Sequence, residues 1–295
     1  MRQNTVILTG FVKAVGVWVP ENSGTANSRG LLLVETQRRR SNTVEEDRKN
    51  QNTVFEEIPV ITENPELIKI INDDINENNL IMVKGNVTTY NNARYFQCAS
   101  CGEITKVDYG MDTVVNPVSI VKLSDDKKFE SDTDRALWLK NNAEISNLVS
   151  LSGTLVRDLT ETNYFSPVEN NQDHERDTLS FQVASNRLRF ISEDDPDKRA
   201  DFPWISFQGK ESYEYFKNLR QSSIIFVEGA LRGRSVKQST TCAHCGGLAE
   251  TQVPVMDVVP FHIEYVSRCG TEPETDDYES FDEYEENLAK DWFFG

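Results

Sequence analysis

Hydrophobic and polar residues alternate, or run together as short apolar stretches, in five segments of each half of the chain. In the first half the segments are 5–19, 31–40, 56–61, 80–87 and 113–123. In the second half they are 148–160, 179–190, 201–207, 224–231 and 257–266. Segments of this length with a period of two predict β-strands, so we expect a mainly β protein.

A helix is expected between the third and fourth strands of each half. Asn64 is a suitable N-cap and Pro65 suits the first turn. The apolar stripe that follows consists of Leu67, Ile68, Ile71 and Ile75. A weaker stripe in the second half consists of Tyr213, Phe216 and Leu219.

The two halves keep register over a long stretch when the sequence is shifted by 144 positions. Pro59 then meets Pro203, and Gly85 meets Gly229. The pentapeptide CASCG that begins at Cys98 meets CAHCG, which begins at Cys242. Self-similarity at a fixed offset indicates an internal duplication.

Three strands, a helix and two strands form the order of the five-stranded OB barrel. Gly10 and Gly153 in the first strands suit the sharp bend of such a barrel. We therefore expect two tandem OB barrels, each with one helix between strands 3 and 4 and a cysteine-bearing hairpin insertion. A different small barrel or a half-open sheet would have the same element order. The expected divisions are OB domain 1 at 1–124, a linker with a short helix at 125–145, OB domain 2 at 146–268 and a disordered acidic tail at 269–295.

Two C-x-x-C-G segments each supply half of a tetrahedral zinc site. If a pseudo-twofold axis brings the two insertions together, one structural zinc ion would be held by Cys98, Cys101, Cys242 and Cys245. Pairing between chains and completion of the second site by His244 are alternatives, as are metal-free thiols or a redox pair. The redox alternative is disfavoured because C-x-x-C oxidoreductases place the motif at the start of a helix.

The net charge of −17 is concentrated at the C-terminus. Residues 271–295 contain ten acidic residues and one lysine. Their net charge of −9 is more than half of the net charge of the whole chain. Such a tail is typical of an interaction segment. No apolar run long enough to span a membrane and no signal peptide is seen, and the sparse paired cysteines favour a reducing cytoplasm.

The chain resembles the single-stranded DNA-binding proteins of bacterial and bacteriophage replication. The resemblance rests on the strand order, on the apolar-V-x-G pattern at Val83–Gly85 and Val227–Gly229, and on the acidic tail that ends in aromatic residues. It implies that Trp292, Phe293 and Phe294 dock on replication or recombination proteins. The tip of the tail differs from the family pattern, which has a proline and a terminal phenylalanine, because this tip has no proline and ends in Gly295. The cysteine insertions are not found in the ordinary bacterial proteins and suggest a divergent, phage-encoded branch, which would act in the host cytoplasm.

Sequence-independent binding to single strands uses aromatic faces for bases and cations for the backbone. The candidates in the first half are Trp18, Arg38, Arg40, Phe55, Lys84, Tyr90, Arg94, Tyr95 and Phe96. Those in the second half are Phe181, Arg187, Arg189, Phe190, Arg232, Arg234 and Lys237.

These features predict non-catalytic coating of single-stranded DNA in replication, recombination or repair, by a monomer or homodimer. No nucleophile–base motif, phosphate loop or paired-carboxylate motif indicates an enzyme. A tandem-OB zinc factor that binds RNA or acts in transcription is an alternative, and so is a protein-interaction scaffold.

Overall fold

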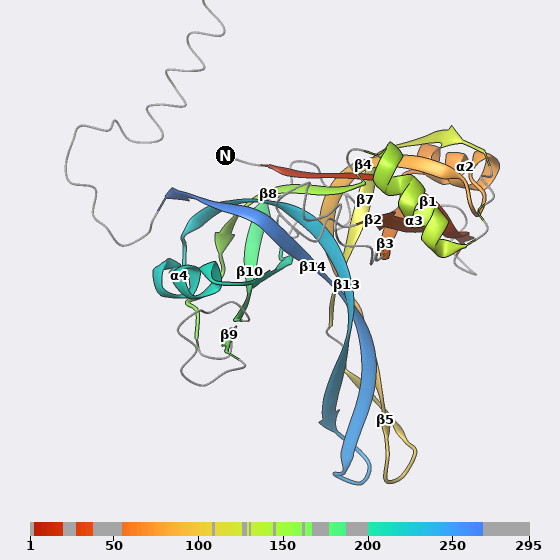
Figure 1. Cartoon of the computed structure of the whole chain (residues 1–295). Helices are drawn as coiled ribbons and strands as arrows, with labels where there is room; N and C mark the ends of the chain where they lie inside the picture. Colours follow the sequence, from red (N-terminus) through yellow and green to blue (C-terminus); the bar gives the residue numbers. More distant parts are fainter. Residues whose placement is uncertain are drawn as a thin grey trace, which may run out of the picture.

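The computed structural model describes residues 3–19, 28–37, 55–107, 110–125, 129, 131–143, 146–160, 163–166, 177–186 and 200–267. The described chain is mainly β, with helices on the outside of the strand layers (Figure 1). Within these residues, no helix is long and apolar enough to cross a membrane.

A closed five-stranded barrel forms in the first half of the chain. Its strands are β1 (Asn4–Trp18), β2 (Arg29–Gln37), β3 (Phe55–Thr62), β4 (Leu80–Asn91) and β7 (Met111–Ser124). Antiparallel pairs join β1 to β2, β2 to β3, β1 to β4 and β4 to β7. A parallel contact between Val60 in β3 and Val115 in β7 closes the circuit. This connectivity confirms the predicted OB-type barrel.

Within the first barrel, strand β1 pairs with both β4 and β2 because it changes direction near Gly10. Residues up to Phe11 pair with β4, and residues from Phe11 onwards pair with β2. A Cβ atom at Gly10 would lie 2.2 Å from the carbonyl oxygen of Glu35 in β2. Glycine is therefore required by the close approach of the two backbones at the bend.

Helix α2 (Pro65–Asp74) lies between β3 and β4, as the sequence predicts. The Asn64 side chain accepts a hydrogen bond from the backbone N–H of Glu66 at 2.9 Å, which satisfies a free donor of the first turn. Leu67 and Ile71 are buried against the barrel.

The second half repeats the same circuit of pairings. Its strands are β8 (Asn147–Leu155), β10 (Thr178–Asn186), β12 (Trp204–Gln208), β13 (Ile224–Thr241) and β14 (Leu248–Ser267). Antiparallel pairs join β8 to β10, β10 to β12, β13 to β14 and β13 to β8, and β12 runs parallel to β14. The short strands β9 (Tyr164–Phe165) and β11 (Ala200–Asp201) flank this circuit, and helix α4 (Glu211–Asn218) precedes β13.

Strands β1 and β8 join the two circuits into one sheet. They pair antiparallel from Asn4 opposite Leu151 to Leu8 opposite Asn147. Two asparagines brace this junction in equivalent ways: Asn4 exchanges two hydrogen bonds of 2.8 Å with the Val87 backbone, and Asn147 exchanges two of 2.9 Å with the Leu231 backbone.

Helix α3 (Asp132–Asn142) lies in the segment between the two circuits and packs on the first barrel. Leu139 is fully buried there beside Phe11, and Trp138 packs against the same ring with centroids 5.8 Å apart.

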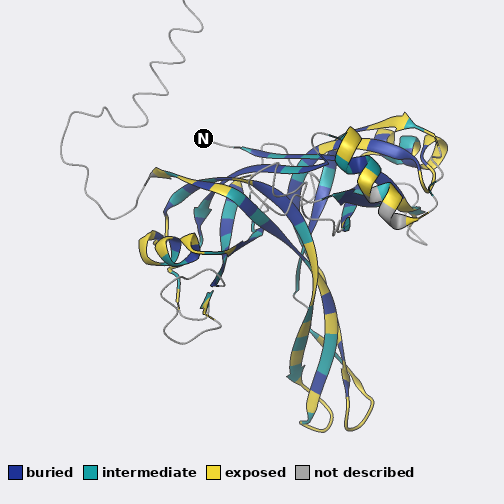
Figure 2. Ribbon diagram, in the orientation of Figure 1, coloured by how far each residue is buried: buried dark blue, intermediate teal, exposed yellow. Residues whose placement is uncertain are grey.

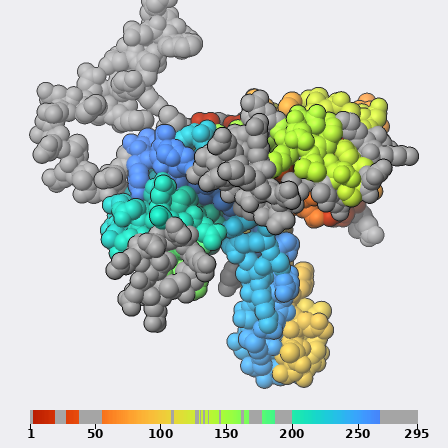
Figure 3. Space-filling model, in the orientation of Figure 1, coloured from red at the N-terminus to blue at the C-terminus, as the bar shows by residue number. Residues whose placement is uncertain are grey.

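A two-hairpin arm projects from the barrels (Figures 1 and 3). One hairpin contains β5 (Arg94–Cys98) and β6 (Ile104–Val107), and the other is the far part of β13 and β14, residues 234–253. The sequence predicts a separate insertion in each half, but β13 and β14 run unbroken from the barrel to the tip. Residues on the arm are more exposed than the strands of the barrels (Figure 2).

Candidate functional site

The four paired cysteines occupy two equivalent turns at the tip of the arm. The backbone N–H of Gly102 donates to the carbonyl of Cys98 at 2.9 Å, and that of Gly246 donates to the carbonyl of Cys242 at 3.0 Å. Both glycines have a left-handed backbone, with φ of +75° and +72°. The repeated glycine is explained by this turn, because residues with a Cβ rarely adopt that conformation.

The turns face each other, so the four sulfur atoms form one cluster. All four lie within 4.8 Å of one another. The Sγ atoms of Cys98 and Cys245 are 3.5 Å apart, and those of Cys101 and Cys242 are 3.7 Å apart. A tetrahedral site with metal–sulfur bonds of about 2.3 Å requires sulfur atoms about 3.8 Å apart. The cluster therefore fits a four-coordinate zinc ion.

A small apolar layer supports the cluster. Cys98 and Cys242 are almost fully buried and pack with Phe96 and Ala249. Direct pairing between the two hairpins consists of Cys98 opposite Ala249 and Gln97 opposite Glu250. This is a short contact for two hairpins of such length.

The thiols have unequal acidities. Backbone N–H groups of Cys101 and Ser100 hold the pKa of Cys98 below its usual value, and those of Cys245 and His244 lower the pKa of Cys242 to about 6. Although the backbone of Glu103 lowers the pKa of Cys101, the neighbouring Cys245 and burial raise it to about 12. The raised pKa of Cys101 reflects repulsion between neighbouring sulfur atoms, which a bound cation would offset.

A groove lies where the arm joins the first barrel. It has a volume of about 760 Å³. The floor is the outer face of β2 and β3, where the apolar side chains are Leu33, Phe55, Pro59 and Ile61. One wall comes from the ends of β4 and β7, and the other comes from the arm root at Gly233–Ser235 and Pro254–Met256. In an OB barrel, the face of strands 2 and 3 is the usual ligand-binding face.

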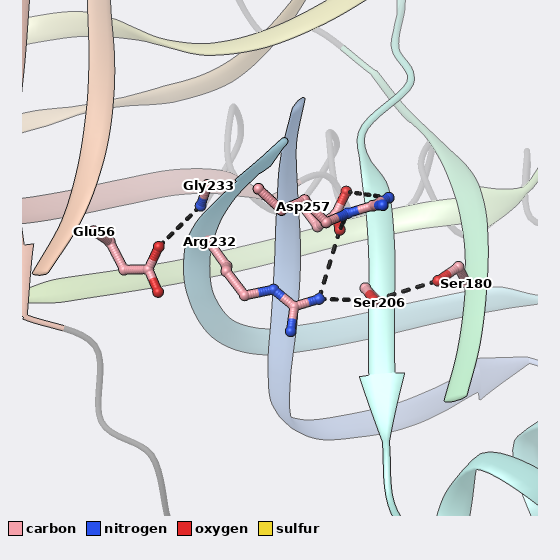
Figure 4. A network of polar contacts seen from close by, with 7 residues as sticks. Glu56, Ser180, Ser206, Arg232, Gly233 and Asp257 are labelled. Carbon is pink, nitrogen blue, oxygen red and sulfur yellow. Dashed lines mark hydrogen bonds and ion pairs between the residues drawn. The ribbon is translucent and has the colours of Figure 1, made fainter. Parts of the chain in front are cut away.

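The acidic groups of the groove have partners within the protein. Glu57 pairs with Lys13, and Asp112 pairs with Arg94. The Glu56 carboxylate accepts a hydrogen bond from the backbone N–H of Gly233 at 3.0 Å (Figure 4). Because these carboxylates are engaged, their charges oppose an anionic ligand less than free carboxylates would.

The two basic groups of the groove lie at its rim and are also paired. Arg29 contacts Glu63 at 2.8 Å, and Arg234 contacts Asp257 at 2.5 Å. Their side chains keep 46% and 41% exposure, so both guanidinium groups can also reach a ligand in the groove.

The equivalent face of the second circuit carries a polar network instead of an apolar floor. Asp257 is fully buried. Its carboxylate forms an ion pair with Arg234 and a second one, at 3.7 Å, with Arg232. Arg232 also donates to the Ser206 hydroxyl at 3.0 Å, and Ser180 donates to the same hydroxyl at 3.3 Å (Figure 4). The two faces therefore differ in chemistry although their strands are arranged alike.

Of the residues predicted to contact DNA, the structure brings Phe55, Tyr90 and Arg234 together around the groove. Arg232 lies beside Arg234 on Asp257. Arg94 stands behind the groove wall, where it holds Asp112.

Other predicted residues lie elsewhere. Trp18 and Tyr95 are exposed at 52% and 59%, but they do not line the groove. Lys84 is exposed on the outside of β4, and Lys237 pairs with Glu250 on the arm. Those outside the described residues are Arg38, Arg40, Arg187, Arg189, Phe190, Trp292, Phe293 and Phe294.

Two predicted residues are buried in the structure. Phe96 is 4% exposed and packs in the apolar layer below the cysteines, and Phe181 is 1% exposed and packs in the barrel core. Neither ring offers a face to a nucleic acid, so both are excluded from the candidate interface. They lie on the inward side of alternating strands, a side that an aromatic-and-basic pattern does not reveal.

The apolar floor of the groove was not predicted from the sequence. Leu31 and Leu33 in β2, and Pro59 and Ile61 in β3, face outward on strands whose inward positions are also apolar. The sequence did contain a signal for this floor, because β2 and β3 carry apolar residues on both of their sides. A strand with one exposed side normally alternates apolar and polar residues.

No family model matches the sequence, and a search of curated proteins found no match. Solved structures do match. The wild-type single-stranded DNA-binding protein from Thermus aquaticus has 14% sequence identity and a TM-score of 0.54, with 94% of this chain and 98% of that chain covered. A deletion mutant of the same protein has 15% identity and a TM-score of 0.53, with 95% and 98% covered. These similarities support the predicted OB-type fold.

Proposed function

We propose that this protein binds single-stranded DNA without catalysis and largely without sequence preference, and protects it during replication, recombination or repair. The observation that carries the proposal is the groove on the outer face of β2 and β3. Its position matches the ligand-binding face of OB folds, and the Thermus proteins with the same fold are single-stranded DNA-binding proteins.

The groove suits a strand held mainly through its bases. Phe55 and Tyr90 offer aromatic surface, and Leu33, Pro59 and Ile61 offer an apolar floor against which bases can pack. Arg29 and Arg234 at the rim would contact the sugar–phosphate backbone. Stacking without base-edge hydrogen bonding explains why such a site would tolerate any sequence.

The cysteine cluster would bind one structural zinc ion within a single chain. The four-sulfur donor set and the sulfur separations support zinc over cations that prefer oxygen ligands. The ion would neutralise the thiolates and join the two hairpins of the arm.

The acidic tail would recruit replication or recombination proteins through Trp292, Phe293 and Phe294, which lie outside the described residues. This part of the proposal rests on the sequence resemblance. The protein would act in the cytoplasm, which is that of the host cell if the protein is phage-encoded.

Binding of a fluorescent oligo-dT of about 30 nucleotides, measured by anisotropy, tests the proposed function. Phe55→Ala and Tyr90→Ala should each weaken binding by about 1–3 kcal/mol, or roughly fivefold to over a hundredfold. Tyr95→Ala removes an exposed aromatic ring away from the groove and is the matched control. Absence of binding by the folded wild-type protein would overturn the proposal, and a loss with Tyr95→Ala alone would move the site to the arm.

The apolar floor also favours a second candidate, a peptide-binding scaffold. Leu33, Pro59 and Ile61 would accept an apolar peptide as readily as a base. Competition separates the two functions, because in a DNA-binding groove oligo-dT should displace any bound peptide. A matched oligo-rU tests RNA as the preferred strand.

A further inference from the structure

The two walls of the groove continue directly into the two hairpins of the arm. The wall at Tyr90–Asn92 leads into β5 through one residue, Ala93, and the wall at Asp112–Val114 leads back from β6. The opposite wall at Gly233–Ser235 and Pro254–Met256 is the root of the long β13–β14 hairpin. Each wall therefore belongs to one hairpin, and each hairpin carries one pair of cysteines.

At their far ends the hairpins meet at the cysteine cluster. Five residues (93–97) lie between the first wall and Cys98, and six (236–241) lie between the second wall and Cys242. At about 3.3 Å per residue, the cluster lies roughly 20 Å from the groove. Apart from the sulfur atoms, the described contacts at the tip are limited. They include the two ladder pairs of β5 with β14, the apolar layer, a 3.2 Å hydrogen bond from the Ala243 N–H to Thr105 Oγ1, and a 3.4 Å hydrogen bond from the Ala99 N–H to Leu248 O.

At the groove itself, the arm root is tied to the floor by the hydrogen bond from Gly233 to Glu56 (Figure 4). Gly233 and Ser235 are exposed, and the Arg234 side chain between them pairs with Asp257 of the same hairpin. A small rotation of the long hairpin would therefore change the width of the groove, unless its tip is held to the first hairpin.

We propose that metal binding at Cys98, Cys101, Cys242 and Cys245 is a clasp that fixes the separation of the groove walls and so slows release of a bound strand. This inference rests on the proposed function. A tetrahedral ion bonded to both hairpins would hold them at one separation, because the metal–sulfur bonds fix the distance between the two turns. Rigid walls lower the ordering cost of binding, and the gain is seen mainly in the dissociation rate.

The test compares the full-length zinc-loaded protein with the same protein after chelation and after zinc is added back. Dissociation of labelled oligo-dT is followed by stopped-flow competition. Chelation should raise the dissociation rate by roughly tenfold, and added zinc should restore it. Cobalt substitution reports the site without DNA, because four thiolate ligands give strong charge-transfer and tetrahedral ligand-field bands.

Hydrogen exchange provides a readout that does not depend on DNA. After chelation, backbone amides at 233–235 and 90–92 should exchange faster, while those of the core strand β8 should not change. Cys245→Ser should reproduce the chelated protein, and Ser239→Ala, an exposed position on the same hairpin, is the matched control.

Each outcome has a separate meaning. Equal dissociation rates and unchanged exchange with and without zinc would overturn the clasp while leaving DNA binding intact. Failure of the protein to bind cobalt with a four-thiolate spectrum would overturn the metal site and the clasp together. Failure of the zinc-loaded protein to bind DNA would instead overturn the proposed function.

Discussion

The salt dependence of DNA binding should distinguish the groove rim from the arm as the path of the sugar–phosphate backbone. Arg29 and Lys237 are matched cations. Arg29 lies at the groove rim, is 46% exposed and pairs with Glu63 at 2.8 Å, whereas Lys237 lies on the arm, is 60% exposed and pairs with Glu250 at 2.7 Å. Replacing each with alanine removes one exposed, paired cation and little packing.

The expected effect follows from counterion release. Each phosphate neutralised on a single strand contributes about −0.7 to the slope of log affinity against log salt. If Arg29 contacts one phosphate, Arg29→Ala should make the slope shallower by about 0.7. The defect should then shrink about 2.6-fold between about 50 mM and about 200 mM salt. Lys237→Ala should give a line parallel to that of the wild type.

The assay is anisotropy of labelled oligo-dT at four or more salt concentrations, with circular dichroism to confirm folding of each variant. A line for Arg29→Ala parallel to the wild type would refute phosphate contact at the rim. A shallower slope for Lys237→Ala alone would place the strand along the arm instead.

Three further predictions concern stability and the cysteine turns. Asp257→Ala should lower the free energy of unfolding by about 3 kcal/mol in urea titrations, because the buried partner of Arg234 is lost; a loss below about 1 kcal/mol would contradict this. Gly246→Ala should weaken cobalt binding about fivefold to thirtyfold, because the left-handed turn costs about 1–2 kcal/mol with a Cβ. Burial raises the pKa of Tyr215 from 10.0 to about 12, so its contribution to stability is complete below pH 10 and is lost as the pH rises through 12. Tyr215→Phe should flatten this alkaline decline in unfolding titrations, at the cost of the hydrogen bond from Tyr215 to the Ile263 carbonyl.

Much of the strand framework was predictable because local patterns specify it. Alternation located the strands around Val6, Val34 and Val83, and the cap at Asn64 located helix α2. The meeting of the four cysteines was also predictable, because one C-x-x-C pair cannot complete a tetrahedral site.

The groove was harder to predict because its lining comes from both halves of the chain. Met256 and Gly233 reach the face formed by Leu33 and Pro59 only through the path of the long hairpin. Nothing in the local sequence specifies that β13 and β14 remain paired beyond the barrel. Burial of Phe96 and Phe181 likewise depends on which side of a strand faces a neighbour, and a one-residue change of register would reverse it.

The pairing of β1 with β8 has a consequence for how the protein can be divided. In this pairing, β1 residues Asn4–Leu8 lie against β8 residues Asn147–Leu151, so each segment covers a strand edge of the other half. A fragment that ends after residue 124, or one that begins near residue 146, would expose an unpaired edge strand with apolar neighbours. Such edges recruit a strand from another chain, so each half expressed alone should aggregate or assemble with itself. The intact chain should instead unfold in one cooperative transition.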